Sequence, residues 1–245
     1  MIFSYSSRMV FASLLCLLFN LGACAQPATS TSDKSLYTFQ EPTRDGTGKY
    51  YMGREIAAIM GAGGASWLDR DSRQQEENTN LAISKFPLTP STKVADIGAG
   101  SGYYTFKVAA KVPEGKVYAV EIQDEMIQLL KENKSKLSNS NVEIVKGGEQ
   151  SPNLPDSSID LAFMVDVYHE LLHPREMLQN IRKALKPHGK LLLLEYKMED
   201  PSVPIKKLHK MSVAQVTKEL AANGFTLSYN GDFLPLQHIL VFEKK

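Results

Sequence analysis

The sequence has almost no cysteine and no excess of charge of either sign. Its 245 residues include two cysteines, Cys16 and Cys24, which are too few for a disulfide scaffold. The 28 Lys and Arg residues balance 27 Asp and Glu residues, and this net charge of +1 offers no broad basic face for nucleic acid, so we expect no such partner. With 43% hydrophobic and 22% charged residues, disorder, collagen and coiled coil are excluded as the main architecture, and one globular domain with additional segments is expected.

A long apolar run is also missing. The run Met9–Phe19 is shorter than the roughly 20 residues of a transmembrane helix. It follows Arg8 and precedes small residues, an order typical of a secretory signal peptide. Leu21–Cys24 resembles a bacterial lipobox, which implies cleavage before Cys24 and lipidation of its thiol. We therefore expect an exported lipoprotein of the bacterial cell envelope, membrane-anchored on the periplasmic side, with a signal peptide at 1–23, a flexible tether at 24–45 and a folded domain at 46–245.

The folded part alternates β-rich runs with helical patterns. Strands are expected at 92–97, 116–122, 141–146, 159–165 and 189–196, and helices at 124–137, at 175–185 and between the capping box that begins at Ser212 and the stop at Gly224. Such alternation predicts parallel strands with right-handed crossovers. The runs 225–229 and 238–242 have no helix between them and should pair antiparallel. Two further helices, at 50–60 and 66–86, are expected before the first strand of this α/β, seven-stranded sheet.

A glycine-rich loop, Asp96–Gly102, follows the first of these strands and opens a helix. Glycines permit a tight turn and let backbone N–H groups approach a ligand. Glu121 stands near the end of the next strand, where a carboxylate can accept hydrogen bonds from the two hydroxyls of a ribose. The two motifs together predict a ligand that contains adenosine, and the alternative is a tight strand–helix turn without a ligand.

The loop departs from the dinucleotide fingerprint G-x-G-x-x-G. Its third glycine, Gly102, comes one residue early, and Tyr103 occupies the fingerprint position. Asp96 would repel a diphosphate, whereas its carboxylate can hydrogen-bond the ammonium of an amino acid directly or through water. These departures favour S-adenosyl-L-methionine, a zwitterion that carries adenosine, over NAD.

These residues resemble the cofactor site of class I S-adenosylmethionine-dependent methyltransferases. The resemblance covers 49–245, includes the segments 166–170 and 185–189, and is closest to small-molecule enzymes of the quinone-methylating type. It implies a Rossmann-like sheet of order 3-2-1-4-5-7-6 and S-adenosylmethionine as cofactor. The cofactor-binding residues that it implies are Gly98, Gly100 and Gly102 beside the methionine portion, Glu121 on the ribose and Asp166 near the methionine end. Glu149 or Gln150 could accept a hydrogen bond from the adenine amino group, and the sequence leaves both open.

The segment His169–His173 matches the zinc-hydrolase pattern H-E-x-x-H, which needs both histidines on one helical face. Pro174 disfavours helical geometry at His173. On the methyltransferase interpretation no metal is expected, and the catalytic candidates are His169, as a base towards a hydroxyl acceptor, and Glu170, which could orient it. The acceptor is expected to be a small or lipid-like molecule. A zinc-dependent hydrolase and a non-catalytic adenosine-binding lipoprotein are the alternatives, and His173 and His209 are otherwise expected at the surface.

Overall fold

The computed structural model describes residues 1–3, 36–138 and 140–245, and its compact folded unit is Ser35–Lys245. Residues 4–23 of the expected signal peptide, Cys24 and the expected tether up to residue 35 therefore lie outside the described residues. Strand β1 (Tyr37–Phe39) pairs antiparallel with β2 (Gly46–Tyr51). Because β1 falls within 24–45, the predicted start of the folded domain at residue 46 is too late.

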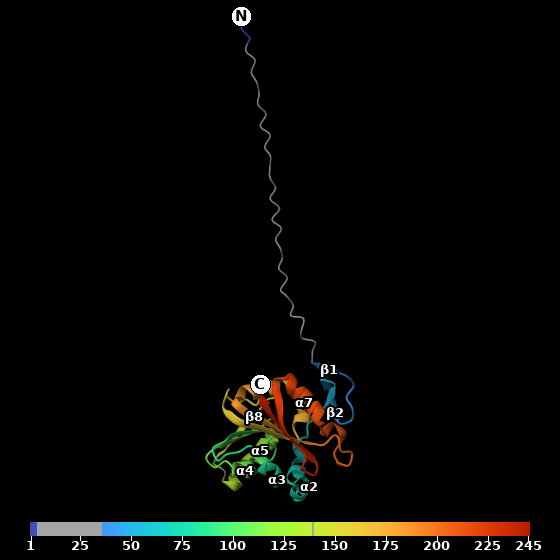
Figure 1. Ribbon diagram of the computed structural model, residues 1–245, viewed down its shortest axis with the longest axis vertical. Coiled ribbons are helices and arrows are strands. Elements are labelled where there is room, and N and C mark those ends of the chain that lie inside the picture. Colours follow the sequence, from blue (N-terminus) through green and yellow to red (C-terminus); the bar gives the residue numbers. More distant parts are fainter. Residues whose placement is uncertain (4–35, 139) are drawn as a thin grey trace. The chain divides into compact units, whose positions relative to one another are not determined.

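Seven strands form the central sheet, in the order β6-β5-β4-β7-β8-β10-β9 (Figure 1). The sheet is parallel except for β10, which runs antiparallel to both β8 and β9. The predicted Rossmann-like fold, strand order and final hairpin are therefore confirmed. The strands are β4 (Lys93–Ile97), β5 (Lys116–Glu121), β6 (Val142–Lys146), β7 (Ile159–Val165), β8 (Leu185–Tyr196), β9 (Phe225–Gly231) and β10 (Gln237–Lys244).

Helices cover both faces of this sheet. Residues of α3 (Thr79–Ser84), α4 (Tyr103–Ala109) and α5 (Asp124–Leu137) pack into one apolar cluster. Those of α6 (Pro174–Ala184) and α7 (Val213–Ala222) pack into the other, and Figure 1 shows α7 across the sheet from α4 and α5. The side chains of Leu191–Leu194 in β8 alternate between the two clusters, which explains why this strand reads as a continuous apolar run. Ser212 caps α7 as predicted, because its Oγ accepts from the N–H of Gln215 at 3.1 Å.

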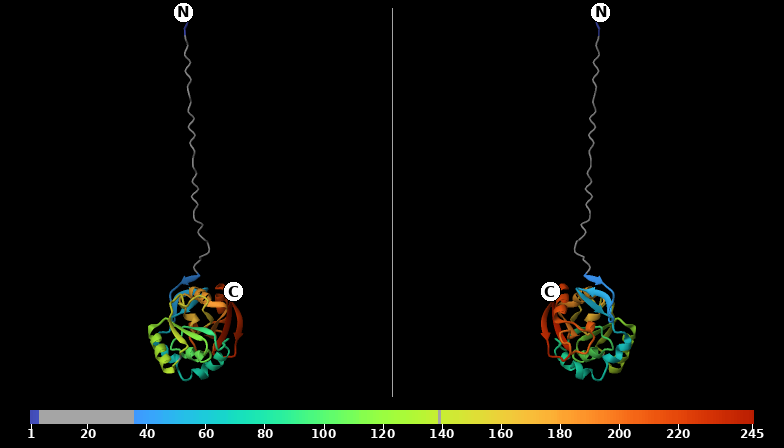
Figure 2. Two further views of the ribbon diagram at one scale, coloured as in Figure 1. Left: turned by 90° about the vertical axis from the view of Figure 1, so that its left-hand side faces the viewer. Right: turned by 90° about the vertical axis from the view of Figure 1, so that its right-hand side faces the viewer.

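The predicted helix at 50–60 is wrong. This segment contains the end of β2 and all of β3 (Arg54–Ala57), joined by a turn in which Met52 and Gly53 have φ angles of 50° and 95°. Gly53 adopts the left-handed conformation without a Cβ penalty, and pairing with β1 and β3 satisfies the backbone of β2 on both edges. The sheet β1-β2-β3 lies beside the segments that follow β7 (Figure 2), where β3 packs against the 3₁₀ helices η2 (Tyr168–Glu170) and η3 (Lys207–His209).

The second predicted N-terminal helix, at 66–86, is divided into short pieces. The 3₁₀ helix η1 (Ala62–Gly64) leads into α1 (Ala65–Leu68), and α2 (Arg73–Glu77) and α3 follow. Asn78 separates α2 from α3 with a φ angle of 53°, which a continuous right-handed helix excludes. In the described part of the chain no helix combines the length and the apolar character that crossing a bilayer requires.

Candidate active site

A cavity of about 580 Å³ opens at the carboxyl ends of β4, β5, β6 and β7. In an open α/β sheet this edge is where ligands bind, beside the strand at which the order of connections reverses. The volume is within the usual range for sites of small molecules. The predicted site residues that line the cavity are Gly98, Gly100, Glu121, Glu149, Asp166, His169 and Glu170.

The glycine loop forms one wall of the cavity. Gly98, Gly100 and Gly102 have φ angles of 75°, 57° and 93°, a region that favours glycine. A Cβ atom on Gly98 would lie 2.6 Å from Val167 Cγ2, and one on Gly100 would lie 2.8 Å from Leu68 Cδ1. Gly102 is not among the residues that line the cavity, because it packs against Phe106 and Leu130. The predicted contact of Gly102 with a ligand therefore does not follow from this geometry.

Glu121 lies at the end of β5 with its carboxylate against the loop. Its Oε2 accepts from the N–H of Gly100 at 2.9 Å, and its Oε1 accepts from the N–H groups of Ile122 and Gln123 at 2.7 and 2.8 Å. A carboxylate offers about four acceptor positions, so these three bonds leave capacity for a ligand hydroxyl. Glu121 thus fixes the loop and can still bind a ribose.

The two candidate aspartates occupy different places. Asp166 follows β7 with a φ angle of 54° and lines the cavity. Its Oδ2 accepts from Gln237 Nε2 at 2.8 Å, whereas its buried Oδ1 has no hydrogen-bond partner among the described residues. Burial raises the pKa of Asp166 well above its usual range. Asp166 lines the same cavity as Gly98, and its carboxyl group has hydrogen-bonding capacity left for the ammonium of the methionine portion, so this end of the cavity fits S-adenosylmethionine.

Asp96 lies beneath the loop instead and does not line the cavity. It is almost fully buried, and its Oδ2 accepts from the hydroxyl of Thr105 at 2.6 Å. Burial raises the pKa of Asp96 to about 7, with a further increase from Glu121, while the hydrogen bond from Thr105 and the charge of Arg73 oppose the change. The structure therefore favours Asp166 over Asp96 as the group that meets an ammonium.

Replacing Asp96 with asparagine should remove a pH dependence of stability between about pH 4 and pH 7. In this window the unfolded chain has lost the Asp96 proton and the folded chain keeps it, because the pKa rises from 3.8 to about 7 on folding. The free energy of unfolding of the wild type therefore falls as pH rises through this range. Urea titrations measure the free energy of unfolding of both proteins. The value for the variant should rise relative to that of the wild type from pH 4 to pH 7, and the difference between them should be constant above pH 7. A difference that does not change with pH would contradict this assignment.

The adenine end of the site distinguishes two residues that the sequence could not separate. Glu149 lines the cavity together with Gly147 and Gly148, after β6. Gln150 is exposed and is not among the lining residues, and its backbone carbonyl accepts from Asn180 Nδ2. The geometry therefore favours Glu149 as the acceptor for the adenine amino group.

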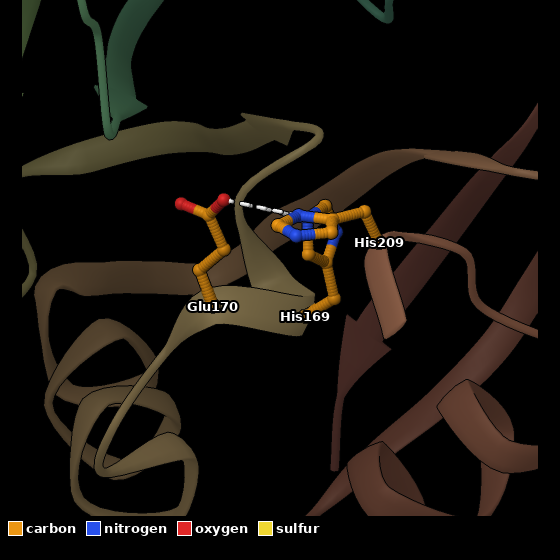
Figure 3. Close-up of side chains that lie close together, drawn as sticks. All are labelled: His169, Glu170 and His209. Atoms are coloured by element: carbon orange, nitrogen blue, oxygen red, sulfur yellow. Dashed lines mark hydrogen bonds and ion pairs between the residues drawn. The ribbon is translucent and has the colours of Figure 1, made fainter. Parts of the chain in front are cut away.

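At the other end of the cavity, three side chains converge from two segments (Figure 3). His169 and Glu170 come from η2, after β7, and His209 comes from η3. The Nε2 atom of His169 lies 3.2 Å from Nδ1 of His209, which lies 3.3 Å from Oε1 of Glu170. Behind them, Oε2 of Glu195 lies 2.6 Å from Nδ1 of His169. All three converging residues line the cavity, so they face the place that an acceptor would occupy.

The electrostatics of these side chains change the role expected of His169. Burial alone would lower the pKa of His169, but the carboxylates of Glu195 and Glu170 raise it to about 10. Burial would raise the pKa of Glu170, but hydrogen bonds from His169 and His209 lower it to about 2. These carboxylates favour the protonated form of His169 when nothing else is bound, and an imidazolium cannot accept a proton. The general-base role of His169 stays a prediction, and the direction of this pKa shift argues against it.

The H-E-x-x-H pattern does not form a zinc-hydrolase site. His169 and Glu170 are in a 3₁₀ helix, and His173 is the N-cap of α6 rather than part of the same helix. The side chain of His173 contacts Lys49 and Glu149 instead of the His169 side chain. Its Nδ1 lies 3.2 Å from Lys49 Nζ, and its Nε2 lies 3.6 Å from Glu149 Oε2. The second histidine of the cluster is His209, which we expected at the surface.

Three residues of the site were missed in the sequence. Glu195 could have been found from the sequence, because it is a lone acidic residue in the buried run of β8. His209 and Arg73 could not, since they lie in irregular or polar segments that carry no motif. Arg73 is almost fully buried and lines the cavity, and it donates from Nε to Glu77 at 2.9 Å and from Nη1 to the carbonyl of Leu68 at 2.8 Å.

A buried ion pair holds the segment that carries His169. Arg54 of β3 donates to both carboxylate oxygens of Glu219 in α7, at 2.9 and 3.0 Å, and to the carbonyl of His169 at 3.1 Å. The hydroxyl of Tyr168 also donates to Glu219, at 2.7 Å. These bonds tie the N-terminal sheet, α7 and η2 together and fix the backbone beneath the His169 side chain.

Comparisons with known proteins bear on the family and the fold of this chain. A family profile described as "Methyltransferase domain" matches residues 88–231. A probable cobalt-precorrin-6B C(15)-methyltransferase (decarboxylating) of Sulfurisphaera tokodaii is 31% identical over 157 residues, 63% of this chain and 80% of that protein. A ubiquinone/menaquinone biosynthesis C-methyltransferase of Ectopseudomonas mendocina is 30% identical over 111 residues, and this chain spans only 43% of its length. The crystal structure of a SAM-dependent methyltransferase from Aquifex aeolicus matches 76% of this chain and 100% of its own, with a TM-score of 0.72 and 26% identity.

Proposed function

Because the chain belongs to the methyltransferase-domain family and is an S-adenosylmethionine-dependent methyltransferase, we propose that it methylates a small or lipid-like, largely apolar acceptor. The observation that carries the proposal is the continuity of the cavity. One space extends from the glycine loop and Glu121 to the cluster of His169, Glu170 and His209. Donor and acceptor can therefore lie side by side in it.

The donor end is formed by Glu121 for the ribose, Glu149 for the adenine, and Asp166 with the backbone at Gly98 for the methionine portion. Bound S-adenosylmethionine supplies a methyl group that its sulfonium already activates for in-line displacement. The protein then has to hold the acceptor in line and exclude water. Trp67 and Ile59 line the cavity near its exposed rim and are placed to cover it.

The acceptor end combines apolar walls with one polar cluster. Leu171, Leu172, Met177 and Ile205 line the cavity there and suit a hydrophobic molecule. The polar cluster suits a single oxygen or nitrogen group on that molecule, since few well-placed polar groups orient a ligand in an apolar pocket. The two relatives, named as a precorrin and a quinone C-methyltransferase, are also enzymes that act on small molecules.

The proposal is tested with methyl-labelled S-adenosylmethionine. We expect the purified protein to transfer label to an organic-solvent extract of the native cell envelope, and not to proteins or nucleic acids of the same cells. The Glu121→Gln variant is the matched control, because it should lose transfer with the same extract. Label that appears only in polar, water-soluble products would contradict an apolar acceptor.

We also propose that the chain is exported, cleaved before Cys24 and anchored in the envelope by lipid on that thiol. Support comes from the sequence of residues 8–24 alone. In cells fed a labelled fatty acid, the wild type should carry label and sediment with membranes. Cys24→Ala should carry none and remain at its precursor size, whereas Cys16→Ala should behave as the wild type. Labelling that survives Cys24→Ala would refute this anchor.

A further inference from the structure

We propose that His169, Glu170 and His209 bind a divalent transition-metal ion, with an open coordination position facing the acceptor end of the cavity. The ligand atoms are Nε2 of His169, Nδ1 of His209 and Oε1 of Glu170 (Figure 3). They converge from η2 and η3, which the fold packs together. Two imidazoles and a carboxylate are ligands that zinc and similar ions prefer.

The spacing of these atoms fits a metal. They are separated by 3.2 Å between the two histidines, 3.3 Å between His209 and Glu170, and 3.7 Å between His169 and Glu170. In a tetrahedral zinc site with bonds of about 2.0–2.2 Å, neighbouring ligand atoms are roughly 3.3–3.6 Å apart. The three atoms are therefore close to metal-binding positions already, and small side-chain rotations complete the site.

A second layer of contacts orients the ligands. Glu195 lies 2.6 Å from Nδ1 of His169, so this carboxylate holds the proton on Nδ1 and leaves Nε2 to bind the ion once the proton on Nε2 is released. Such a carboxylate–histidine pair is the usual support of a metal-ligating histidine. The N–H of Met60 donates to Oε1 of Glu170 at 3.2 Å and holds this side chain in place.

The charge at the site also calls for a cation. Glu170 and Glu195 bring two carboxylates to two imidazoles in a mostly buried position. The nearby guanidinium of Arg54 is matched by Glu219, so it does not neutralise them. With no ion bound, a proton on His169 supplies part of the balancing positive charge. A divalent ion on Nε2 would displace that proton and balance both carboxylates, which are costly to bury unpaired.

Three protein ligands and a free position are the arrangement of catalytic rather than structural metal sites. This role rests on the proposed function, because the free position faces the acceptor. A metal ion at this place restricts the class of acceptor to apolar molecules with an oxygen or nitrogen ligand atom, such as that of a hydroxyl or carbonyl group, that can reach the ion. In this arrangement His169 holds the metal and is not a proton acceptor.

The test is a titration of the chelator-treated, full-length protein with Co²⁺ and Zn²⁺, followed by visible absorption and calorimetry. We expect one ion per chain and the strong visible bands of four-coordinate cobalt. Glu170→Gln and His209→Ala should weaken binding by about 100-fold or more, and Glu195→Gln by about 10–100-fold, the usual effect of losing an outer partner. His173→Ala, which removes the second histidine of the sequence motif, should bind as the wild type.

No saturable binding by the wild type would overturn the proposal, as would unchanged binding by His209→Ala or loss of binding in His173→Ala. The wild-type stoichiometry decides the question even if a variant fails to fold. Titration of the same metal-free protein with S-adenosylmethionine separates the two proposals. Cofactor binding without cobalt binding would overturn only the metal site, and cobalt binding without cofactor binding would overturn only the proposed function.

Discussion

Replacing Glu121 with glutamine should weaken the binding of S-adenosylmethionine by about 100-fold. The carboxylate is the one acidic group at the end of β5 that lines the cavity, and hydrogen bonds to a charged group contribute about 1.5–3 kcal/mol each. In the wild type, the N–H of Gly100 donates to Oε2 of Glu121 at 2.9 Å. Glutamine keeps one carbonyl oxygen, but an amide N–H₂ in the place of Oε2 cannot accept this hydrogen bond. The loop and the ribose site are therefore disturbed together. Calorimetric titration with the cofactor measures the loss.

Glu143→Gln is the matched control for this prediction. Glu143 is a glutamate on the neighbouring strand β6, paired with Lys116 at 2.6 Å, and its side chain is half exposed and outside the cavity. It should bind the cofactor as the wild type does. Equal cofactor affinity in Glu121→Gln and the wild type would show that the ribose lies elsewhere.

Arg54→Met should lower the free energy of unfolding by about 3–5 kcal/mol, the usual effect of removing one partner from a buried ion pair. The change leaves the fully buried carboxylate of Glu219 without its cation, and it removes the bond to the carbonyl of His169. The second variant, Glu219→Gln, should recover part of the loss when it is combined with Arg54→Met, because the uncompensated charge is then gone. Urea unfolding of the two single variants and the double variant measures this coupling.

Lys116→Met provides the comparison for an exposed pair. The side chains of Lys116 and Glu143 are 41% and 50% exposed, so this change should alter stability by less than about 1 kcal/mol. An Arg54→Met effect as small as that of Lys116→Met would contradict the assigned role of the buried pair. So would a double variant that is no more stable than Arg54→Met alone.

The central sheet could be predicted because its signals are local and repeated. The four-leucine run of β8 contacts a different cluster with each successive residue, and such two-sided burial leaves a continuous apolar run. The capping box that begins at Ser212 likewise predicts the start of α7 from only four residues. The segment at 50–60 could not be predicted in this way. Its strands are short, and β3 buries three successive residues, so no alternation of buried and exposed residues marks it as a strand.

The site could be predicted only where a motif carries it. The loop at 98–102 and Glu121 belong to a strand–turn–helix pattern that can be read along the chain. His209 and Arg73 reach the cavity through tertiary packing of η3 and α2, so neither is marked by its neighbours in sequence. The H-E-x-x-H pattern shows the opposite case, because Pro174 starts α6 and sends His173 away from His169.

A crystal structure with S-adenosylhomocysteine bound would test the central claim most directly. The account predicts the ribose hydroxyls on Glu121, the adenine beside Glu149, the amino group on the carboxyl group of Asp166 and the sulfur facing the His169 cluster. A ligand that lies outside this cavity, or one whose ribose makes no contact with Glu121, would contradict it.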